Sequence, residues 1–365
     1  MLLGTSAVSL TPPQPQHSVS AQLLGEATDD GSFARWASSS GRVQRLPLSG
    51  NSSSGVADTC NTGFSAVPCA KSLSITYLNL LKRTDRKEHM KSMLSAIRDP
   101  QGMLAGTAFR SPGIVAKCPN AHDMCSVSPD SILDAHALFE MEKNPAYLET
   151  ARAQAAEEGK PPPESYMQLM SATRRQGTWG CFAAHVSALA EYNRSRETPF
   201  RLMLEDDVVL TDGFLPAVAD ALAQLPKRDA WHIVRFGISN WGQPKSKDEK
   251  DRIFNGSNVF RALEQPYQPR LMGELYMGGH AVLVQRETIA ELLDHIMRMG
   301  LVDVDITYKE QPQGFDASFS SFAVDTPAVY LKDFGSSRDP GRKNSPSTKK
   351  THFRDLSFDG RHQDA

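Results

Sequence analysis

Apolar runs alternate with amphipathic stretches through the middle of the chain. Residues Leu73–Tyr77 alternate apolar and polar side chains, as a half-buried strand does, and lead into the apolar Leu78–Leu81. The next stretch has the spacing of one helical face, at Met90, Met93, Leu94 and Ile97. Further strands are predicted at 202–204, 208–210, 231–236 and 280–284, and further amphipathic helices follow Cys181, Asp212 and Arg286. Strands that alternate with helices predict an α/β fold, with a mixed, mostly parallel sheet flanked by helices.

Outside this middle region the periodicity disappears. Residues 1–70 are rich in Ser, Gly, Thr and Pro, which predicts a disordered tail. A folded domain is predicted over 71–335, with a helical insertion on its surface near 127–170, where Asn144 and Pro145 begin a helix. Residues 336–365 are predicted to form a basic, mobile tail; the alternative is that the basic stretch from Lys332 to Arg354 closes over a diphosphate.

The turn after the first predicted strand is basic, with Arg83 and Arg86. Thr84 or Asp85 is expected to cap the helix that follows, with Glu88 completing a capping box. Backbone N–H groups and guanidinium forks in such a turn bind anions, typically a phosphate. The alternative is a solvated basic turn without a ligand.

Three consecutive acids, Glu205, Asp206 and Asp207, lie between the apolar runs 202–204 and 208–210. Carboxylates held this close repel one another and resist desolvation, so a bound cation or a basic partner would stabilise them. Oxygen ligands of this kind suit magnesium or manganese, usually shared with a substrate diphosphate. Ligands of such sheets bind at the carboxyl ends of strands, which favours a site here. The alternative is a solvated acidic turn.

A glycine-containing stretch, Gly177–Cys181, precedes the next predicted helix. Its glycines, Gly177 and Gly180, permit close approach of the backbone to a ligand. His185 lies beside the apolar face of the helix, where a histidine more often makes a structural hydrogen bond than binds a ligand. Cys181 is expected to be a small core residue.

Composition narrows the classes of partner. A net charge of −2 over 365 residues gives no general attraction to nucleic acid, and no apolar run is long enough to span a bilayer. The first ten residues make a poor signal peptide, which favours a cytoplasmic or membrane-peripheral location and leaves the secretory lumen open. Four of the five cysteines, Cys60, Cys69, Cys118 and Cys125, lack zinc-knuckle spacing, and disulfides between them would require an oxidising compartment.

The order of these motifs resembles glycosyltransferase family 25, which includes bacterial lipooligosaccharide galactosyltransferases and procollagen galactosyltransferases. The matching pieces, within roughly residues 72–335, are Tyr77–Leu80 with Arg83 and Arg86, Gly177–Cys181 with His185, Leu204–Val208, Trp231–Val234, Gly278–Val282 and Val302–Asp305. Two positions depart from the family pattern: Ala184 replaces a common serine, and Val282 replaces a common tyrosine. The resemblance implies a GT-A-type fold, a nucleotide-sugar donor and a divalent cation.

The resemblance also implies roles for individual residues. Glu205 and Asp207 would hold the cation, Mn²⁺ in preference to Mg²⁺. The donor, expected to be a UDP-sugar, would be bound by Asn79, Arg83, Arg86, Gly180, His185 and Asp206. Asp303 or Asp305 would act as the catalytic base, and both would lie on one side of an extended segment. The expected activity is inverting transfer of a sugar, galactose first, to a glycan or glycoprotein; the alternative is an inactive transferase fold that serves as a binding or scaffold protein.

Overall fold

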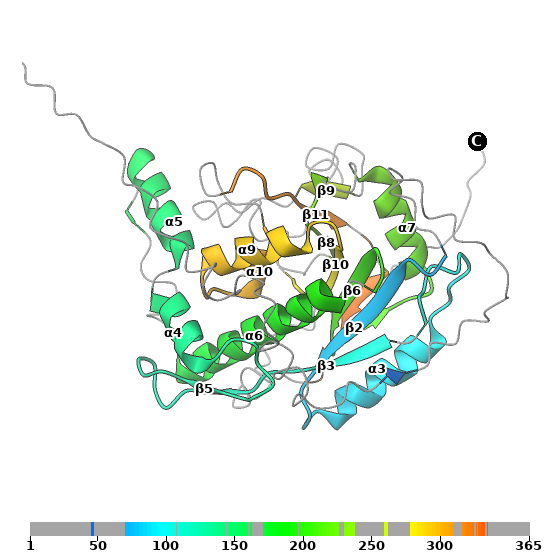
Figure 1. Ribbon diagram of the computed structural model, residues 1–365, viewed down its shortest axis with the longest axis horizontal. Helices are drawn as coiled ribbons and strands as arrows, with labels where there is room; N and C mark the ends of the chain where they lie inside the picture. The colour runs from blue at the N-terminus through cyan, green and yellow to red at the C-terminus, as the bar shows by residue number, and fades with distance from the viewer. Residues whose placement is uncertain are drawn as a thin grey trace, which may run out of the picture. The chain divides into compact units, whose positions relative to one another are not determined.

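Strands from both halves of the chain form one mixed sheet (Figure 1). The computed structural model describes residues 45–46, 70–106, 108–143, 145–159, 161–162, 171–195, 197–225, 230–237, 259–261, 278–309, 316–324, 326, 328–332 and 334. The chain divides into two compact units, Met1–Ser40 and Gly41–Ala365, and every described residue belongs to the second.

The sheet has eight strands in the order β1-β3-β2-β6-β10-β8-β11-β9. Their bounds are β1 Arg45–Leu46, β2 Leu73–Asn79, β3 Ala108–Pro112, β6 Phe200–Glu205, β8 Ile233–Phe236, β9 Val259–Arg261, β10 Ala281–Gln285 and β11 Ser321–Val324. Strands β2, β3, β6, β8 and β11 run in one direction, and β1, β9 and β10 run in the other. The expected α/β fold with a mixed, mostly parallel sheet is therefore confirmed.

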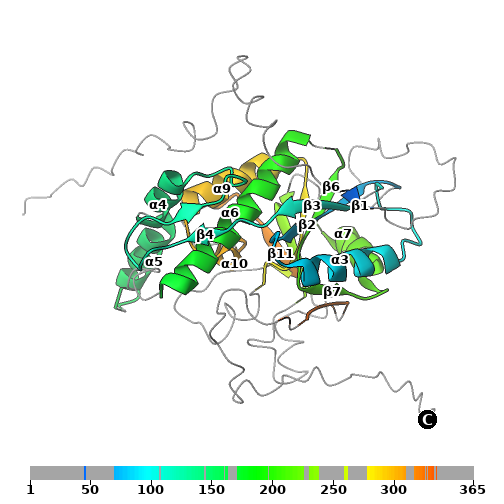
Figure 2. The same cartoon turned by 90° about the horizontal axis from the view of Figure 1, so that it is seen from below.

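Helices cover both faces of this sheet (Figures 1 and 2). One face packs against α4 (Ala135–Lys143), α6 (Ala172–Ser195), α9 (Ile289–Met299) and α10 (Val304–Thr307), and the other packs against α3 (Thr84–Ala96) and α7 (Phe214–Gln224). Side chains alternate between these two faces along β6. Met203 is buried on the face that α6 and α9 cover, whereas Leu202 and Leu204 are buried on the face that α3 and α7 cover. A further helix, α5 (Ala146–Glu157), packs on α9.

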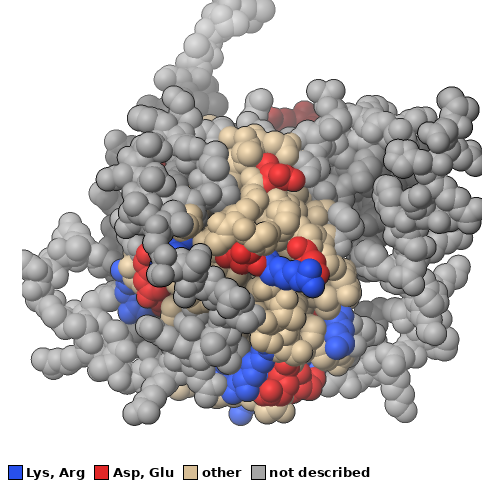
Figure 3. Space-filling view, turned by 90° about the vertical axis from the view of Figure 1, so that its right-hand side faces the viewer, with Lys and Arg blue, Asp and Glu red and all other residues tan. Residues whose placement is uncertain are grey.

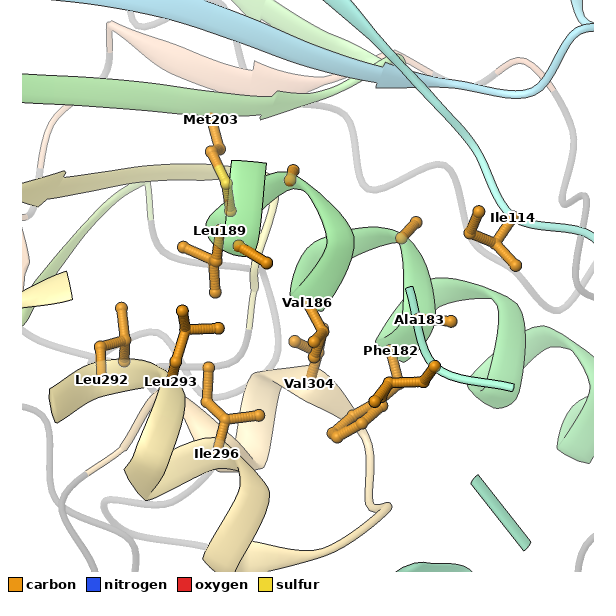
Figure 4. Close-up of a cluster of buried hydrophobic side chains, with 14 of the residues drawn as sticks. Ile114, Phe182, Ala183, Val186, Leu189, Met203, Leu292, Leu293, Ile296 and Val304 are labelled. Carbon is orange, nitrogen blue, oxygen red and sulfur yellow. The ribbon is translucent and has the colours of Figure 1, made fainter. Parts of the chain in front are cut away.

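The packing of α6 on α9 fixes the helix that carries Cys181 and His185. Figure 4 shows Phe182, Val186 and Leu189 of α6 facing Leu292, Leu293 and Ile296 of α9, with Val304 of α10 beside them. Each of these side chains is buried, and burial of one such side chain stabilises the fold by about 1.5–3 kcal/mol. The contact therefore holds α6 in place for the other groups that the helix carries.

A buried ion pair joins α4 to α6. Arg175 donates two hydrogen bonds to the Glu142 carboxylate, from Nε at 2.6 Å and from Nη2 at 2.8 Å. Trp179 donates to the same carboxylate at 2.8 Å. Leu138 and Met141 of α4 are buried in the core that includes α6. Helix α4 is thus part of the domain core, whereas the sequence predicted a surface insertion near 127–170.

Two short two-stranded sheets flank the main one. Strand β7 (Val208–Leu210) pairs with β12 (Val329–Leu331), and β4 (Ala116–Lys117) pairs with β5 (Ser126–Val127). A disulfide joins Cys118 to Cys125 across the second pair, while Cys60 and Cys69 lie outside the described residues.

Several predicted boundaries need correction. Helix α3 begins at Thr84 without a side-chain cap hydrogen bond, because the Asp85 carboxylate binds Arg83 instead. Helix α6 begins at Ala172, so the predicted glycine stretch lies inside it. The segment around Asp303 and Asp305 is not extended, since Val304 begins α10.

The two predicted tails lie mostly outside the described residues. Within 1–70, Arg45–Leu46 pairs with β3 as a short edge strand. Asn144 and residues 336–365 are also outside the described part. Among the described helices, none combines the length and apolar character needed to cross a bilayer.

Candidate functional site

The candidate site lies where two neighbouring parallel strands end. Leu78 of β2 is in register with Glu205 of β6, so the last residues of both strands, Asn79 and Glu205, are at the same edge of the sheet. The chain then turns through Asp206 and Asp207 into β7. This is the carboxyl edge at which sheets of this class bind ligands.

Asp206 is held in a buried polar network. Its carboxylate accepts from Asn79 Nδ2 at 2.7 Å and from Arg86 Nη1 at 2.6 Å. Arg110 in turn donates to the side-chain oxygen of Asn79 at 3.0 Å and to its backbone carbonyl at 2.9 Å. Asn79 and Asp206, both predicted to bind the donor, therefore have hydrogen-bond partners within the protein. Through this network, Asp206 orients Arg86.

Only one of the two carboxylate oxygens of Asp207 has a hydrogen-bond partner in the described part of the chain. Its Oδ2 accepts from Arg86 Nη1 at 3.0 Å, but its Oδ1 is buried and has no hydrogen-bond partner among the described residues. Burial, together with the charges of Glu205 and Asp206, raises the pKa of Asp207 to about 6 even though Arg86 opposes the shift. A further positive charge at Oδ1 would stabilise the ionised form.

The basic turn is covered by the chain that follows β12. Arg83 pairs with Asp85 at 2.8 Å and also donates to the carbonyl of Phe334 at 3.3 Å. The Phe334 ring lies 5.5 Å from Arg86 Cζ and 4.9 Å from Lys332 Nζ. The predicted phosphate-binding forks of Arg83 and Arg86 thus have protein partners in this structure.

A second cluster forms beside the acidic turn. Cys181, His185 and Glu205 each place one ligand atom within 4.8 Å of the other two, which makes a possible metal-binding triad. Glu205 Oε1 lies 3.2 Å from His185 Nε2 and 3.8 Å from Cys181 Sγ. Among the described residues, Glu205 is grouped with these two side chains, whereas the sequence predicted a cation between Glu205 and Asp207.

His185 is fully enclosed. Its Nδ1 lies 2.8 Å from the hydroxyl of Tyr308, which is itself buried. Burial alone would lower the pKa of His185, but Tyr308, Cys181 and Glu205 raise the pKa well above its usual range. Burial raises the pKa of Tyr308 to about 12, so this hydroxyl stays neutral.

Asp305 lies near the same cluster, beside Gly279. A β-carbon at Gly279 would lie 3.1 Å from Asp305 Oδ1 and 3.5 Å from His185 Cε1. The next residue, His280, has a pKa that burial lowers and that the nearby Glu205 and Asp305 raise in part. One of the two predicted catalytic acids is therefore next to the triad.

Asp303 has a different environment. It precedes α10 and accepts from the Thr178 hydroxyl at 3.1 Å. The prediction that Asp303 and Asp305 face the same side of an extended segment is wrong, because Asp305 lies within the helix. Asp316, another nearby acid in sequence, is bound to His295, Arg298 and Ser318.

Gly180 has a packing role. It is buried, and a β-carbon there would lie 2.6 Å from the Ile114 carbonyl oxygen. The absence of a side chain lets α6 approach the backbone after β3, so the predicted contact of Gly180 with a nucleotide sugar is not what the structure supports.

Sequence reasoning missed one member of the triad, Cys181, and the partner of another, Tyr308. Cys181 was expected to be a core residue, although its four-residue spacing from His185 puts both on one helical face. Tyr308 is 123 residues from His185 in the chain and carried no local signal.

Comparison of the chain with protein-family models and with curated proteins finds no match in either. The family 25 resemblance and the activity it implies therefore stay predictions, and the α/β fold with its acidic strand edge is what the protein itself establishes.

Proposed function

We propose that the chain is a metal-dependent glycosyltransferase with a GT-A-like fold, of the family 25 type, that transfers a sugar from a UDP-sugar to a glycan or glycoprotein. Galactose is the first sugar to test. Support comes from the mixed sheet with helices on both faces and from acids at its carboxyl edge.

The observation that carries the proposal is the buried Oδ1 of Asp207, which has no hydrogen-bond partner in the part of the chain that the structure describes. A carboxylate oxygen of this kind fits a hard divalent cation, which typically uses one or two carboxylates together with substrate phosphates. Mn²⁺ is proposed ahead of Mg²⁺. When bound, the cation would supply charge neutralisation for the departing diphosphate.

The neighbouring arginines would bind the diphosphate end of the donor. Arg86 is held in place by Asp206, which is in turn held by Asn79. Arg83 is partly exposed, with 17% of its side chain accessible, and pairs with the exposed Asp85. Its fork can exchange that weak partner for a phosphate at little cost.

Asp305 is the better placed of the two candidate bases. It lies beside Gly279 and the triad, while Asp303 accepts from Thr178 at the start of α10. A base must reach the hydroxyl proton that it removes, so the residue at the cluster is favoured. The proposal therefore gives Asp305 the role of base and Asp303 a structural role.

The test is calorimetric titration of UDP-galactose into the full chain with and without Mn²⁺. We expect Asp207→Ala to abolish the manganese-dependent part of binding and to keep the fold. Asp212→Ala is the matched control, since Asp212 is exposed and forms a long ion pair, 3.7 Å, with the exposed Arg98. Undiminished binding of metal and donor by Asp207→Ala would overturn the proposal.

One contact favours the alternative of an inactive binding or scaffold protein. Arg86 already contacts both Asp206 and Asp207, so the protein supplies its own countercharge at the acidic turn. Manganese-dependent hydrolysis or transfer of the sugar separates the two functions. Donor binding without any turnover across a panel of UDP-sugars and acceptors would favour the scaffold.

A further inference from the structure

We propose that Cys181, His185 and Glu205 form a binding site for a borderline-soft divalent cation of the zinc class. This site is distinct from the cation proposed at Asp207 and does not rest on the proposed transferase activity. The three side chains come from the α6 helix and from the end of β6.

The spacing of the ligand atoms fits tetrahedral zinc. Zinc bonds of about 2.3 Å to sulfur and about 2.0 Å to nitrogen or oxygen place sulfur and oxygen about 3.5 Å apart, and nitrogen and oxygen about 3.3 Å apart. The observed separations are 3.8 Å from Cys181 Sγ to Glu205 Oε1 and 3.2 Å from His185 Nε2 to Glu205 Oε1. These two separations match tetrahedral zinc to within a few tenths of an ångström, and all three ligand atoms lie within 4.8 Å of one another.

The donor set selects the kind of cation. A thiolate and an imidazole suit zinc and related ions, whereas manganese and magnesium prefer oxygen ligands. This preference differs from that of the site proposed at Asp207, whose carboxylate oxygen suits Mn²⁺. The difference follows from Cys181, since replacing its sulfur with oxygen would leave a harder set of ligands.

The histidine is oriented as a metal ligand requires. Its Nδ1 faces the Tyr308 hydroxyl at 2.8 Å, which leaves Nε2 directed to Glu205. Metal-binding histidines commonly use their other ring nitrogen in this way, and the outer partner fixes the ring and its tautomer. The packing of α6 on α9 holds the helix itself.

The cluster also has an open side. His185 is buried, but Cys181 is partly exposed and 29% of the Glu205 side chain is accessible. Gly279 lacks a side chain where a β-carbon would approach His185 and Asp305. Three protein ligands with access from solvent leave room for a water or a substrate oxygen as the fourth ligand.

The competing explanation is that Cys181, His185 and Glu205 are only hydrogen-bonded to one another and bind no metal. Titration with cobalt distinguishes this explanation from a metal site. The full chain is stripped of metal and titrated with Co²⁺, then with Zn²⁺ and Mn²⁺ in competition. We expect a near-ultraviolet cobalt–thiolate absorption band at one equivalent, and zinc binding at least ~100-fold tighter than manganese binding at this site.

Variants locate the ligands. Cys181→Ser should remove the thiolate band and weaken zinc binding, and Tyr308→Phe should keep the band and weaken zinc binding by about tenfold. Glu205→Gln should weaken zinc binding, with Glu140→Gln as its control, because Glu140 is exposed and pairs with Lys143 on the surface of α4. The double variant Cys60→Ser/Cys69→Ser should keep the band.

The result that overturns the proposal is a cobalt complex without a thiolate band, or zinc binding that is equal in wild type and Cys181→Ser. Asp207→Ala separates the two proposals. It should keep zinc binding at Cys181 while losing manganese-dependent donor binding, so either proposal can fail alone.

Discussion

At the residue scale, a single guanidinium nitrogen balances two acids. Nη1 of Arg86 lies 2.6 Å from Asp206 and 3.0 Å from Asp207, and the three side chains are largely buried. Charges removed from water in this way depend on one another, because removing one partner leaves the others desolvated without compensation.

Arg86→Ala should therefore lower the free energy of unfolding by about 3 kcal/mol. Urea denaturation at neutral pH measures the loss, and addition of Asp207→Asn in the same chain should restore part of it. Arg83→Ala is the matched control, since its partner Asp85 is exposed and solvent screens such surface pairs. Equal losses in the two single variants would show that the buried network is not responsible.

Asp316 provides a pH-dependent contribution away from the candidate site. His295 donates to its carboxylate at 3.1 Å and Ser318 donates at 2.7 Å, with Arg298 also in contact. The His295 hydrogen bond holds the pKa of Asp316 well below its usual range. A carboxylate with a lowered folded-state pKa stabilises the protein at pH values above its unfolded pKa of about 4 and loses that contribution as the pH falls.

We accordingly expect Asp316→Asn to lower the thermal midpoint at pH 7 and to have a smaller effect at pH 3. Thermal unfolding followed by circular dichroism at both pH values measures the difference. Asp220→Asn is the control, because Asp220 is an exposed residue of α7. A pH-independent effect of Asp316→Asn would contradict this explanation.

At the element scale, α6 links the core to the candidate site. One side of the helix packs on α9, and the same helix presents Cys181 and His185 to the end of β6. Its close approach to the chain after β3 depends on Gly180, whose β-carbon position is 2.6 Å from the Ile114 carbonyl oxygen.

Gly180→Ala should destabilise the protein by about 1–3 kcal/mol, because the backbone of either segment must move to remove the overlap. This loss should exceed the helix-propensity gain of about 1 kcal/mol that alanine brings. Gly213→Ala is the control, since its nearest atoms would be 3.9 Å away. Chemical denaturation of both variants tests the prediction, which fails if Gly180→Ala is neutral or stabilising.

At the scale of the whole molecule, the described residues form a sheet with helices on both faces. On the side drawn in Figure 3, basic and acidic side chains of the described residues lie among one another, in keeping with a net charge of −2. The absence of a nucleic-acid partner stays a prediction, as do the cellular location and the glycan or glycoprotein acceptor.

Removal of residues 1–40 should leave the thermal midpoint within about 2 °C of the full chain, a shift that corresponds to about 1 kcal/mol for a protein of this size. The reason is that the unit Gly41–Ala365 contains every described strand and helix. Differential scanning calorimetry compares the two chains. Deletion of residues 1–65 also removes β1, which pairs with β3, so a drop only in this longer deletion would measure that edge strand. A large drop after the shorter deletion would show that the first unit is structural.

Local pattern alone determined the order of the main elements and the position of the acids. The periods of 2 and 3.6 residues depend on which side chains face a core, so β2, α3, β6, α7 and α9 were predictable from short windows. The three acids after an apolar run also marked a strand end. The start of α6 was misjudged because glycine suggested a loop, while packing against Ile114 made it part of a helix.

Only the tertiary structure decided which side chains meet. Arg86 and Asp206 are 120 residues apart in the chain, and His185 and Tyr308 are 123 apart. A hydrophobic period reports that a side chain is buried, but it does not report its partner. Partners depend on strand order and on how closely helices approach the sheet, and these follow from packing of the whole chain. For this reason Glu205 was predictable as a candidate site residue, whereas its grouping with Cys181 and His185 was not.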